Sequence, residues 1–262
     1  MNKIILLFGA ITIIFSSCEK KEYSTQASND HLLAEQIIYD AVSIIEEGFI
    51  SSGINKSCAS YQLTNSDSSN TDTLIINFGK INCLYNLELR RGKITSLFTG
   101  KFRDALAEIK IEFDDYYIND KLVNADVTIT NQGLNNNGNL WYVIEVKNAR
   151  ISTNNGVINW NAKHNRELVA GGDTYNLISD DKYNITGISN GNATNGDDFS
   201  VEITESLNMD LECLPYCVIK NGQAINSVQG YNDRLINYGD TICDCNFEIK
   251  IDEVIYPIKV SK

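Results

Sequence analysis

Residues 109–113 read Ile-Lys-Ile-Glu-Phe, and this alternation of apolar and charged side chains decides the fold class. Residues 127–129 (Val-Thr-Ile) and 247–252 (Phe-Glu-Ile-Lys-Ile-Asp) repeat it. Neighbouring side chains of a strand point to opposite sides, so a period of two predicts strands with one dry and one wet face. Such strands are typical of antiparallel sheets.

The same period runs from about residue 57 to the end of the chain, and turn signals interrupt it at short intervals. Residues that tolerate positive φ predict tight hairpins. They lie at Arg91-Gly92, Asn119-Asp120, Asn154-Asn155-Gly156, Asn195-Gly196 and Asn221-Gly222. Helical periodicity does not return between the strands, which argues against parallel βαβ units. We therefore predict a mainly β domain over residues 30–262, an antiparallel meander forming a curved sheet, sandwich or partial barrel.

One amphipathic helix is predicted at the start of this domain, over about residues 30–48. Its apolar side chains recur at helical spacing and should pack on the sheet. They are Leu33, Ile37, Ala41 and Ile44 or Ile45, with Glu35, Asp40 and Glu46 on the opposite, polar face. Asn29 or Asp30 is the expected cap, and Gly48 is expected to end the helix.

The amino-terminal residues are predicted to direct export and membrane attachment. Lys3, the apolar run Ile4–Phe15 and the small residues Ser16 and Ser17 form a signal peptide over residues 1–17. It stops directly at Cys18, as in a lipobox, although Phe15 is an imperfect match; the alternative is an ordinary signal peptide. A lipid-modified (palmitate-type) Cys18 anchors the chain in a membrane, and residues 18–29 serve as a flexible tether. We expect a location in the cell envelope, at the outer membrane, on its periplasmic or its surface-exposed face.

The charge of the chain restricts its partners. Without Lys3, 21 of the 22 basic residues remain against 34 acidic residues, a net charge of −13 after residue 17. Nucleic acid repels such a surface, and no basic cluster offsets it. A nucleic-acid partner is therefore excluded, and the expected partners are the membrane and a protein or glycan.

Six cysteines follow Cys18, an even number that predicts disulfide bonds in an oxidising compartment. They are Cys58, Cys83, Cys213, Cys217, Cys243 and Cys245. Cys58 and Cys83 flank one candidate hairpin and are expected to pair, whereas the order of the other four stays open. The alternative is a zinc site of those four, but the one-residue gap before Cys245 is shorter than usual ligand spacing.

No catalytic residue is predicted. Gly187-Ile188-Ser189-Asn190-Gly191 matches the G-x-S-x-G pattern of serine hydrolases, which requires a helix after the serine and a histidine later in the chain. Here a strand follows, and both His31 and His164 precede Ser189. We interpret the pentapeptide as a strand segment and both histidines as solvated surface residues.

No metal or cofactor is predicted either. Acidic pairs occur at Asp114-Asp115, Asp180-Asp181 and Asp197-Asp198. The calcium-loop pattern is missing, and a glycosidase pair of carboxylates would have to come from tertiary structure. We expect these acids to be solvated turn residues.

Aromatic side chains near the predicted strands are the candidates for surface binding. They are Tyr116, Tyr117, Trp141, Tyr142 and Trp160. Because neighbours in a strand point to opposite faces, one of Tyr116/Tyr117 and one of Trp141/Tyr142 should point away from the core. Exposed rings suit sugar stacking or protein contact, and cross-strand packing is the alternative.

Several short motifs recur together between residues 58 and 260. They are Asn77-Phe78-Gly79 with Cys83, Arg91-Gly92-Lys93-Ile94, Thr99–Asp104, Phe113–Asn119, Thr128–Asn131, Trp160 with Arg166, Ile185–Gly187, and Asn237–Asp240 before Cys243. The set resembles a family of uncharacterised β-rich lipoproteins of Bacteroidota. Cys245 is additional to that pattern, and Leu168 stands where a larger aromatic residue is expected. The resemblance implies an exported β-rich lipoprotein and no activity.

These observations predict a non-catalytic envelope lipoprotein with a binding or structural role. The alternative is a carrier of a lipid or another hydrophobic ligand in a half-open barrel, and a glycan-acting hydrolase is the third hypothesis. A wide apolar concavity favours the carrier, and a packed interior favours the first hypothesis. A hydrolase requires a cleft with converging carboxylates or a Ser–His contact.

Overall fold

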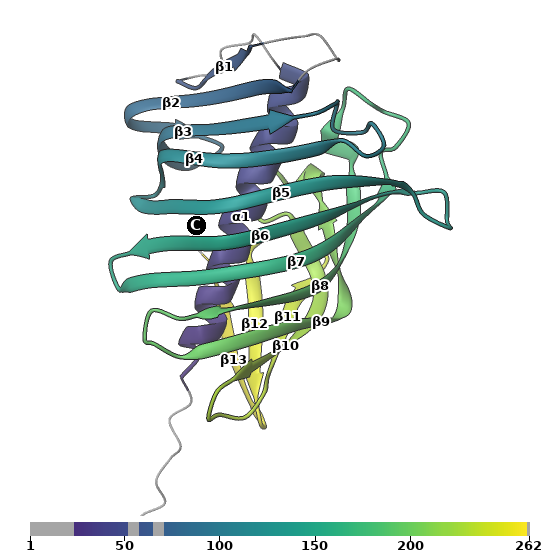
Figure 1. The fold of residues 1–262 in the computed structure, drawn as a ribbon. Helices are drawn as coiled ribbons and strands as arrows, with labels where there is room; N and C mark the ends of the chain where they lie inside the picture. The colour runs from purple at the N-terminus through teal and green to yellow at the C-terminus, as the bar shows by residue number, and fades with distance from the viewer. Residues whose placement is uncertain (1–23, 52–57, 65–70, 261–262) are drawn as a thin grey trace, which may run out of the picture.

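A computed structural model describes residues 24–51, 58–64 and 71–260 of the chain. It consists of one long helix and one sheet of thirteen strands (Figure 1). The predicted signal peptide, Cys18 and the first part of the predicted tether lie outside the described residues. Among the residues that are described, no helix is both long and apolar enough to cross a bilayer.

The sheet is an antiparallel meander in which every strand pairs with its neighbours in sequence. The strands are β1 (Ser60–Leu63), β2 (Asp72–Tyr85), β3 (Glu88–Phe98), β4 (Glu108–Ile118), β5 (Lys121–Leu134), β6 (Leu140–Thr153), β7 (Gly156–Ala170), β8 (Lys182–Asn192), β9 (Asp198–Asp210), β10 (Ile219–Val228), β11 (Arg234–Asp240), β12 (Asn246–Ile251) and β13 (Val254–Lys259). Short 3-10 helices lie at η1 (Ile178–Asp180) and η2 (Leu211–Cys213). β1 and β13 are the two edges, so the sheet is open. The predicted fold class is confirmed, in its curved-sheet form.

The alternation of side chains produces the two faces of this sheet. In β12, Phe247, Ile249 and Ile251 are buried and the residues between them are exposed. The buried side chains of all strands except the edge strand β13 join one hydrophobic core with the apolar residues of the helix. One face of the curved sheet is therefore apolar and packs against the helix.

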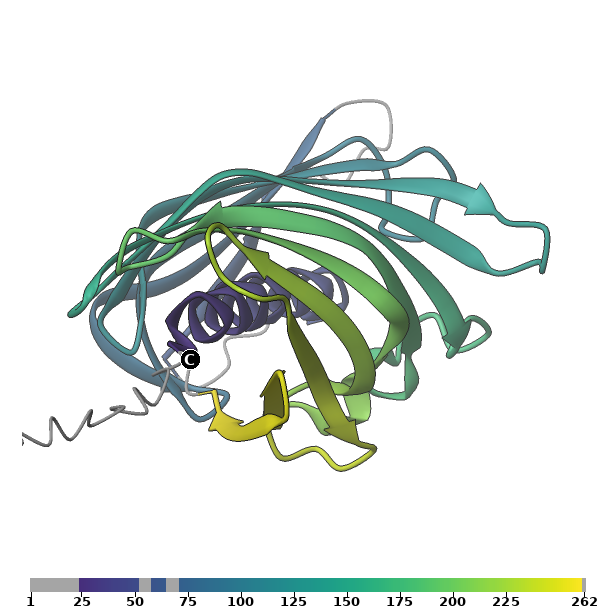
Figure 2. The ribbon, with the colours of Figure 1, turned by 90° about the horizontal axis from the view of Figure 1, so that it is seen from below.

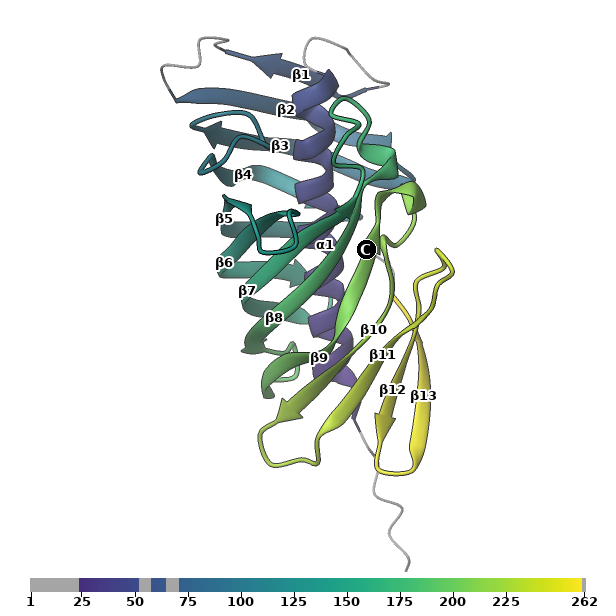
Figure 3. The same ribbon diagram turned by 90° about the vertical axis from the view of Figure 1, so that its right-hand side faces the viewer.

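The helix α1 (Gln26–Ser51) lies inside that curve and crosses the strands on their concave face (Figures 1 and 2). Figure 3 shows it from the side, between β1–β9 and the strands β10–β13. The helix begins at Gln26, earlier than predicted, so Asn29 and Asp30 lie within it and do not cap it. Gly48 does not end it: Gly48 is buried, and an added Cβ there would come within 2.8 Å of Leu74 Cδ2.

The polar face of α1 is also buried, contrary to the amphipathic prediction. Glu35, Asp40 and Glu46 are all at most 6 % exposed, like the apolar residues around them. The reason is geometric, since a sheet that curves round a helix covers the helix on several sides. Buried polar side chains usually find hydrogen-bond partners, and those of Asp40 and Glu46 come from the sheet.

Three of the five predicted turns are hairpins. Asn119-Asp120 joins β4 to β5 with positive φ at both residues, as in a type I′ turn, and the turns at Asn155 and Asn195-Gly196 follow the prediction. Arg91-Gly92 and Asn221-Gly222 lie inside strands instead, where the register shifts. Gly92 has φ +86° and passes so close to Asp115 O that a Cβ would lie 2.0 Å from it. Glycine in a strand here marks a bulge.

Three disulfide bonds join segments that lie 25 to 30 residues apart in the sequence. Cys58 bonds to Cys83, as predicted, and the other pairs are Cys213–Cys243 and Cys217–Cys245. All four carboxy-terminal cysteines are oxidised, so the alternative zinc site is excluded. The disulfides indicate an oxidising compartment outside the cytoplasm.

The Cys58–Cys83 bond should contribute measurably to stability. It closes a loop with a sequence separation of 25 residues, so the double variant Cys58→Ser/Cys83→Ser should lose about 2–4 kcal/mol of unfolding free energy, mainly through the larger entropy of its unfolded chain. Urea denaturation of oxidised protein measures this loss. An unchanged free energy would show that the bond does not constrain the unfolded chain.

Candidate functional site

Two buried carboxylates of α1, Asp40 and Glu46, are held by partners from strands far apart in the sheet. Asp40 receives two hydrogen bonds from the Arg90 guanidinium of β3, at 2.6 and 3.1 Å. Arg90 is 0 % exposed and also donates to the Tyr116 hydroxyl at 2.6 Å. One turn and a half later, Glu46 receives two bonds from Arg166 of β7, at 2.6 and 3.0 Å. These two bidentate ion pairs fix the helix along the concave face.

The amino-terminal half of α1 brings His31 next to the G-x-S-x-G serine, so the Ser–His contact required for a hydrolase is present. Ser189 Oγ lies 3.4 Å from His31 Nδ1. The same nitrogen accepts a hydrogen bond from Trp160 Nε1 at 3.2 Å, so its lone pair is already engaged. Ser189 is 3 % exposed and His31 1 %, and neither lines any of the pockets described below. The pair is therefore buried between the helix and the sheet, away from the pockets that the structure describes.

Both histidines are buried, which corrects their interpretation as solvated residues. Burial lowers the pKa of His31 to about 3, with His164 contributing, and burial lowers the pKa of His164 to about 4. His164 Nδ1 lies 2.7 Å from the Tyr39 hydroxyl. Both rings are therefore neutral in the folded protein, and their contribution to stability is lost as the pH falls from about 6.5 through these values.

Glu35, one turn after His31, produces the opposite dependence. Burial raises the pKa of Glu35 to about 8, and the nearby Tyr238 hydroxyl opposes part of the shift. The unfolded chain loses this proton near pH 4.5, so the contribution is complete below that value and is lost as the pH rises through 8. Raising the pH from 6.5 to 8 is therefore expected to lower the free energy of unfolding, through Glu35, by on the order of 1–2 kcal/mol.

The variant Glu35→Gln should remove this alkaline loss, because the amide stays neutral at every pH. Its unfolding free energy, measured by urea denaturation at pH 6.5 and pH 8, should change less than that of the unmodified protein. An equal change of the unfolding free energy in the two proteins would show that Glu35 is already ionised in the folded state.

Charged and aromatic side chains line a cavity near the carboxy-terminal end of α1. A pocket of about 280 Å³, here called the terminal pocket, opens there. It is lined by Glu46, Phe49, Ile50, Leu63, Asp72, Phe98, Lys101, Phe102, Arg103, Tyr175, Asn176, Ile178, Asp181 and Tyr183. An adjoining cleft of about 670 Å³ shares Ile50, Asn176 and Ile178 with it but has no aromatic side chain in its lining. The terminal pocket is therefore the better candidate for a ligand site.

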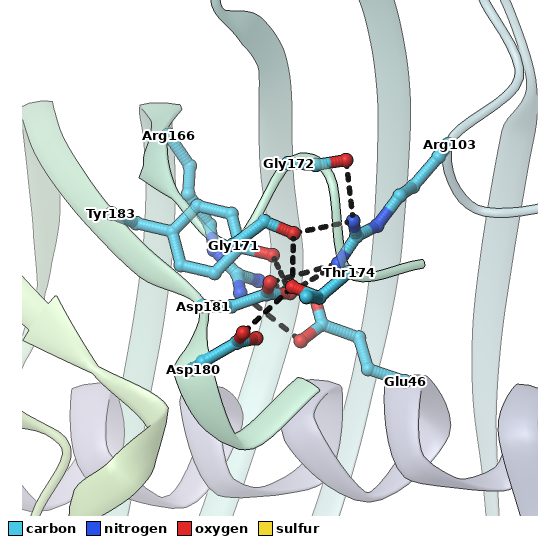
Figure 4. A network of polar contacts seen from close by, with 9 residues as sticks. All are labelled: Glu46, Arg103, Arg166, Gly171, Gly172, Thr174, Asp180, Asp181 and Tyr183. Carbon is cyan, nitrogen blue, oxygen red and sulfur yellow. Dashed lines mark hydrogen bonds and ion pairs between the residues drawn. The ribbon is translucent and has the colours of Figure 1, made fainter. Parts of the chain in front are cut away.

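Two ion pairs contribute to the lining of the terminal pocket, one through Arg103 and Asp181 and the other through Glu46 (Figure 4). Arg103 donates to both carboxylate oxygens of Asp181 at 2.8 Å and to the carbonyls of Gly171 and Gly172. The second pair is Glu46–Arg166, whose guanidinium lies 3.6 Å from the centre of the Tyr183 ring. Both guanidinium groups are thus matched by carboxylates, and neither presents an unpaired charge to a ligand.

Asp181 is held in a mixed environment. Burial raises the pKa of Asp181 to about 6, while Arg103 and the Tyr183 hydroxyl hold it below the value that burial alone would give. Its neighbour Asp180 accepts a hydrogen bond from Thr174 Oγ1 at 2.7 Å. Asp181 is therefore a buried partner of Arg103 and not the solvated turn residue predicted from the sequence, whereas Asp114 and Asp198 are exposed.

The predicted surface aromatics divide as the strand geometry requires. Tyr116 and Tyr142 are buried and their neighbours Tyr117 and Trp141 are partly exposed. Trp160 is only 1 % exposed, so Tyr116, Tyr142 and Trp160 are core residues and not surface binders. The Tyr117 ring is covered by Arg91, whose guanidinium lies 3.6 Å from its centre. Trp141 is partly exposed and stays a candidate for surface binding, and it lines none of the described pockets.

No group of three or more metal-ligating side chains comes together in the described part of the chain. Comparisons with protein-family models, with curated proteins and with solved structures found no match. The terminal pocket was not predicted from the sequence, because its lining comes from α1, β1–β3, the segment after β3, the segment before β8 and β8 itself. Its side chains carry no motif that links them.

Proposed function

We propose that this protein is a non-catalytic envelope lipoprotein that is anchored through a lipid on Cys18 and binds its ligand in the terminal pocket. The observation that carries the proposal is the position of α1. The helix occupies the concave face, and all its described residues from Leu32 to Glu46 except Leu33 are buried. A sheet whose concave face is filled by its own helix is expected to be rigid, and it can therefore hold a ligand site at the end of that helix.

The packed interior argues against the carrier hypothesis. An acyl chain in the concavity would have to replace α1, and would leave Asp40–Arg90 and Glu46–Arg166 without their partners in an apolar space. Leaving a buried charge without its ion-pair partner costs several kcal/mol of stability. The hydrolase hypothesis loses its main support because the Ser189–His31 contact is sealed and Nδ1 is already engaged.

Extraction of the native, membrane-purified protein tests the proposal. Organic solvent extraction followed by mass spectrometry should find no stoichiometric non-covalent lipid, and intact-mass analysis should find acyl chains on a chain that begins at Cys18. One bound lipid per protein would favour the carrier. A chain with an unmodified amino terminus would contradict the proposed lipid anchor.

A further inference from the structure

Asp72 is the carboxylate of the terminal pocket that the protein leaves unmatched. It is the first residue of β2 and is 8 % exposed. Its Oδ1 atom is buried and has no hydrogen-bond partner within the described residues, and no ion pair with Asp72 is formed there. A buried acceptor without a donor is unfavourable, because it has given up its hydrogen bonds to water and gained none in return. A ligand that brings a hydrogen-bond donor to Oδ1 therefore binds more tightly than a ligand of the same shape without a donor.

The other charges of the pocket do not compete for that ligand. Asp181 is matched by Arg103, and Glu46 by Arg166. Lys101 has an exposed side chain and makes no ion pair with Asp72 within 4.0 Å. With the two ion pairs balanced, the site offers one buried negative charge and an exposed lysine.

The aromatic walls meet at angles and so enclose a volume. The rings of Phe49 and Phe98 are inclined by 76° at a centroid distance of 4.7 Å, and Phe49 and Phe102 by 53° at 6.3 Å. Sugar stacking uses one flat, open ring face, whereas a cation is held between several ring faces. Tyr175 and Tyr183 already face guanidinium groups at 5.3 and 3.6 Å, so these walls stabilise positive charge.

On the basis of the proposed binding function, we infer that the terminal pocket binds a small organic cation with a primary ammonium group. The ammonium N–H donates to Asp72 Oδ1, and the alkyl part lies against Phe49, Phe98 and Phe102. A volume of about 280 Å³ admits one small molecule and excludes a folded partner. An anion is disfavoured because both buried guanidinium groups are already bound to carboxylates.

Isothermal titration of the full-length protein in non-ionic detergent tests this inference with a matched pair of ligands. Butylammonium and 1-butanol have the same size and both donate a hydrogen bond, but only the first carries a charge. Butylammonium should bind at least tenfold more tightly than 1-butanol. Glucose and inorganic phosphate, titrated in parallel, should not bind.

Variants then locate the site. Asp72→Asn, a near-isosteric change, should weaken butylammonium binding at least tenfold, and Phe102→Leu should weaken it to a lesser extent. Lys101→Ala should leave binding unchanged or tighten it, and Glu202→Gln, at an exposed position outside the pocket, should have no effect. Thermal melts of each variant verify that it is folded.

Each outcome separates this inference from the binding function on which it rests. Equal binding of the two butyl compounds, preferred binding of glucose or phosphate, or loss of binding in Lys101→Ala would overturn the cation inference and leave a binding protein. The absence of butylammonium binding would also overturn it. The proposed function fails separately, if the extraction experiment finds a stoichiometric lipid in the native protein.

Discussion

The variant Asp40→Ala is expected to lower the free energy of unfolding by about 3–5 kcal/mol, because it leaves a charged guanidinium buried without its carboxylate. Arg90 is 0 % exposed and has only the Tyr116 hydroxyl and the Tyr85 carbonyl as its other hydrogen-bond partners in the described residues. Neither of them carries a compensating charge. Urea denaturation of the variant and of the unmodified protein at one pH measures the difference.

Two controls separate the buried pair from a general effect of charge. Asp114→Ala breaks the Lys93–Asp114 pair, whose side chains are 45 % and 62 % exposed, and should cost at most about 1 kcal/mol. The double variant Asp40→Leu/Arg90→Met replaces the buried pair by apolar side chains and should recover most of the lost stability. A loss in Asp40→Ala no larger than that in Asp114→Ala would show that Arg90 is not sealed between helix and sheet.

The second large effect is expected for Trp160→Ala, at about 3–5 kcal/mol. The Trp160 side chain is among the largest fully buried ones and lies against His31, with the ring centres 6.1 Å apart. Its removal leaves a cavity between β7 and α1 and deprives His31 Nδ1 of its hydrogen-bond donor.

Trp141 provides the matched control, because it is the other tryptophan and lies on the neighbouring strand β6, partly exposed. Trp141→Ala should cost clearly less than Trp160→Ala in the same denaturation experiment. Equal losses would contradict the assignment of Trp160 to the core and would return it to the surface candidates.

The strands were predictable because their signal is local. The alternation of Ile109 and Ile111 with Lys110 and Glu112 is visible in five residues, and the burial of β4 follows it. The same is true of the Asn119-Asp120 hairpin, where two residues that accept positive φ are enough. Arg91-Gly92 shows the limit of this local signal, since a glycine that permits a turn also permits a bulge.

The contents of the concave face were not predictable, because the decisive contacts are remote in sequence. Asp40 and Arg90 are 50 residues apart, and Glu46 and Arg166 are 120 residues apart. A charged helix face is the usual sign of solvent, and only the curvature of the sheet turns it into a buried row. The Ser189–His31 contact, across 158 residues, was missed for the same reason.

The buried polar row of α1 suggests why the chain retains charges in its interior. Apolar side chains alone would allow the helix to slide or rotate in the concavity, since apolar contact has little directionality. Asp40 and Glu46 each accept two bonds from one guanidinium, and such a geometry is satisfied in a single position. That position brings Glu46 and Phe49 to the terminal pocket, so the ion pairs and the candidate site depend on each other.

Hydrogen–deuterium exchange of α1 tests most directly whether the helix fills the sheet in solution. We predict that the backbone amides of residues 32–46 exchange as slowly as those of β6 and β7, with an opening free energy close to that of global unfolding. Exchange of these amides as fast as in the exposed turn at residues 136–138 would mean that the helix leaves the concave face, and would contradict the account.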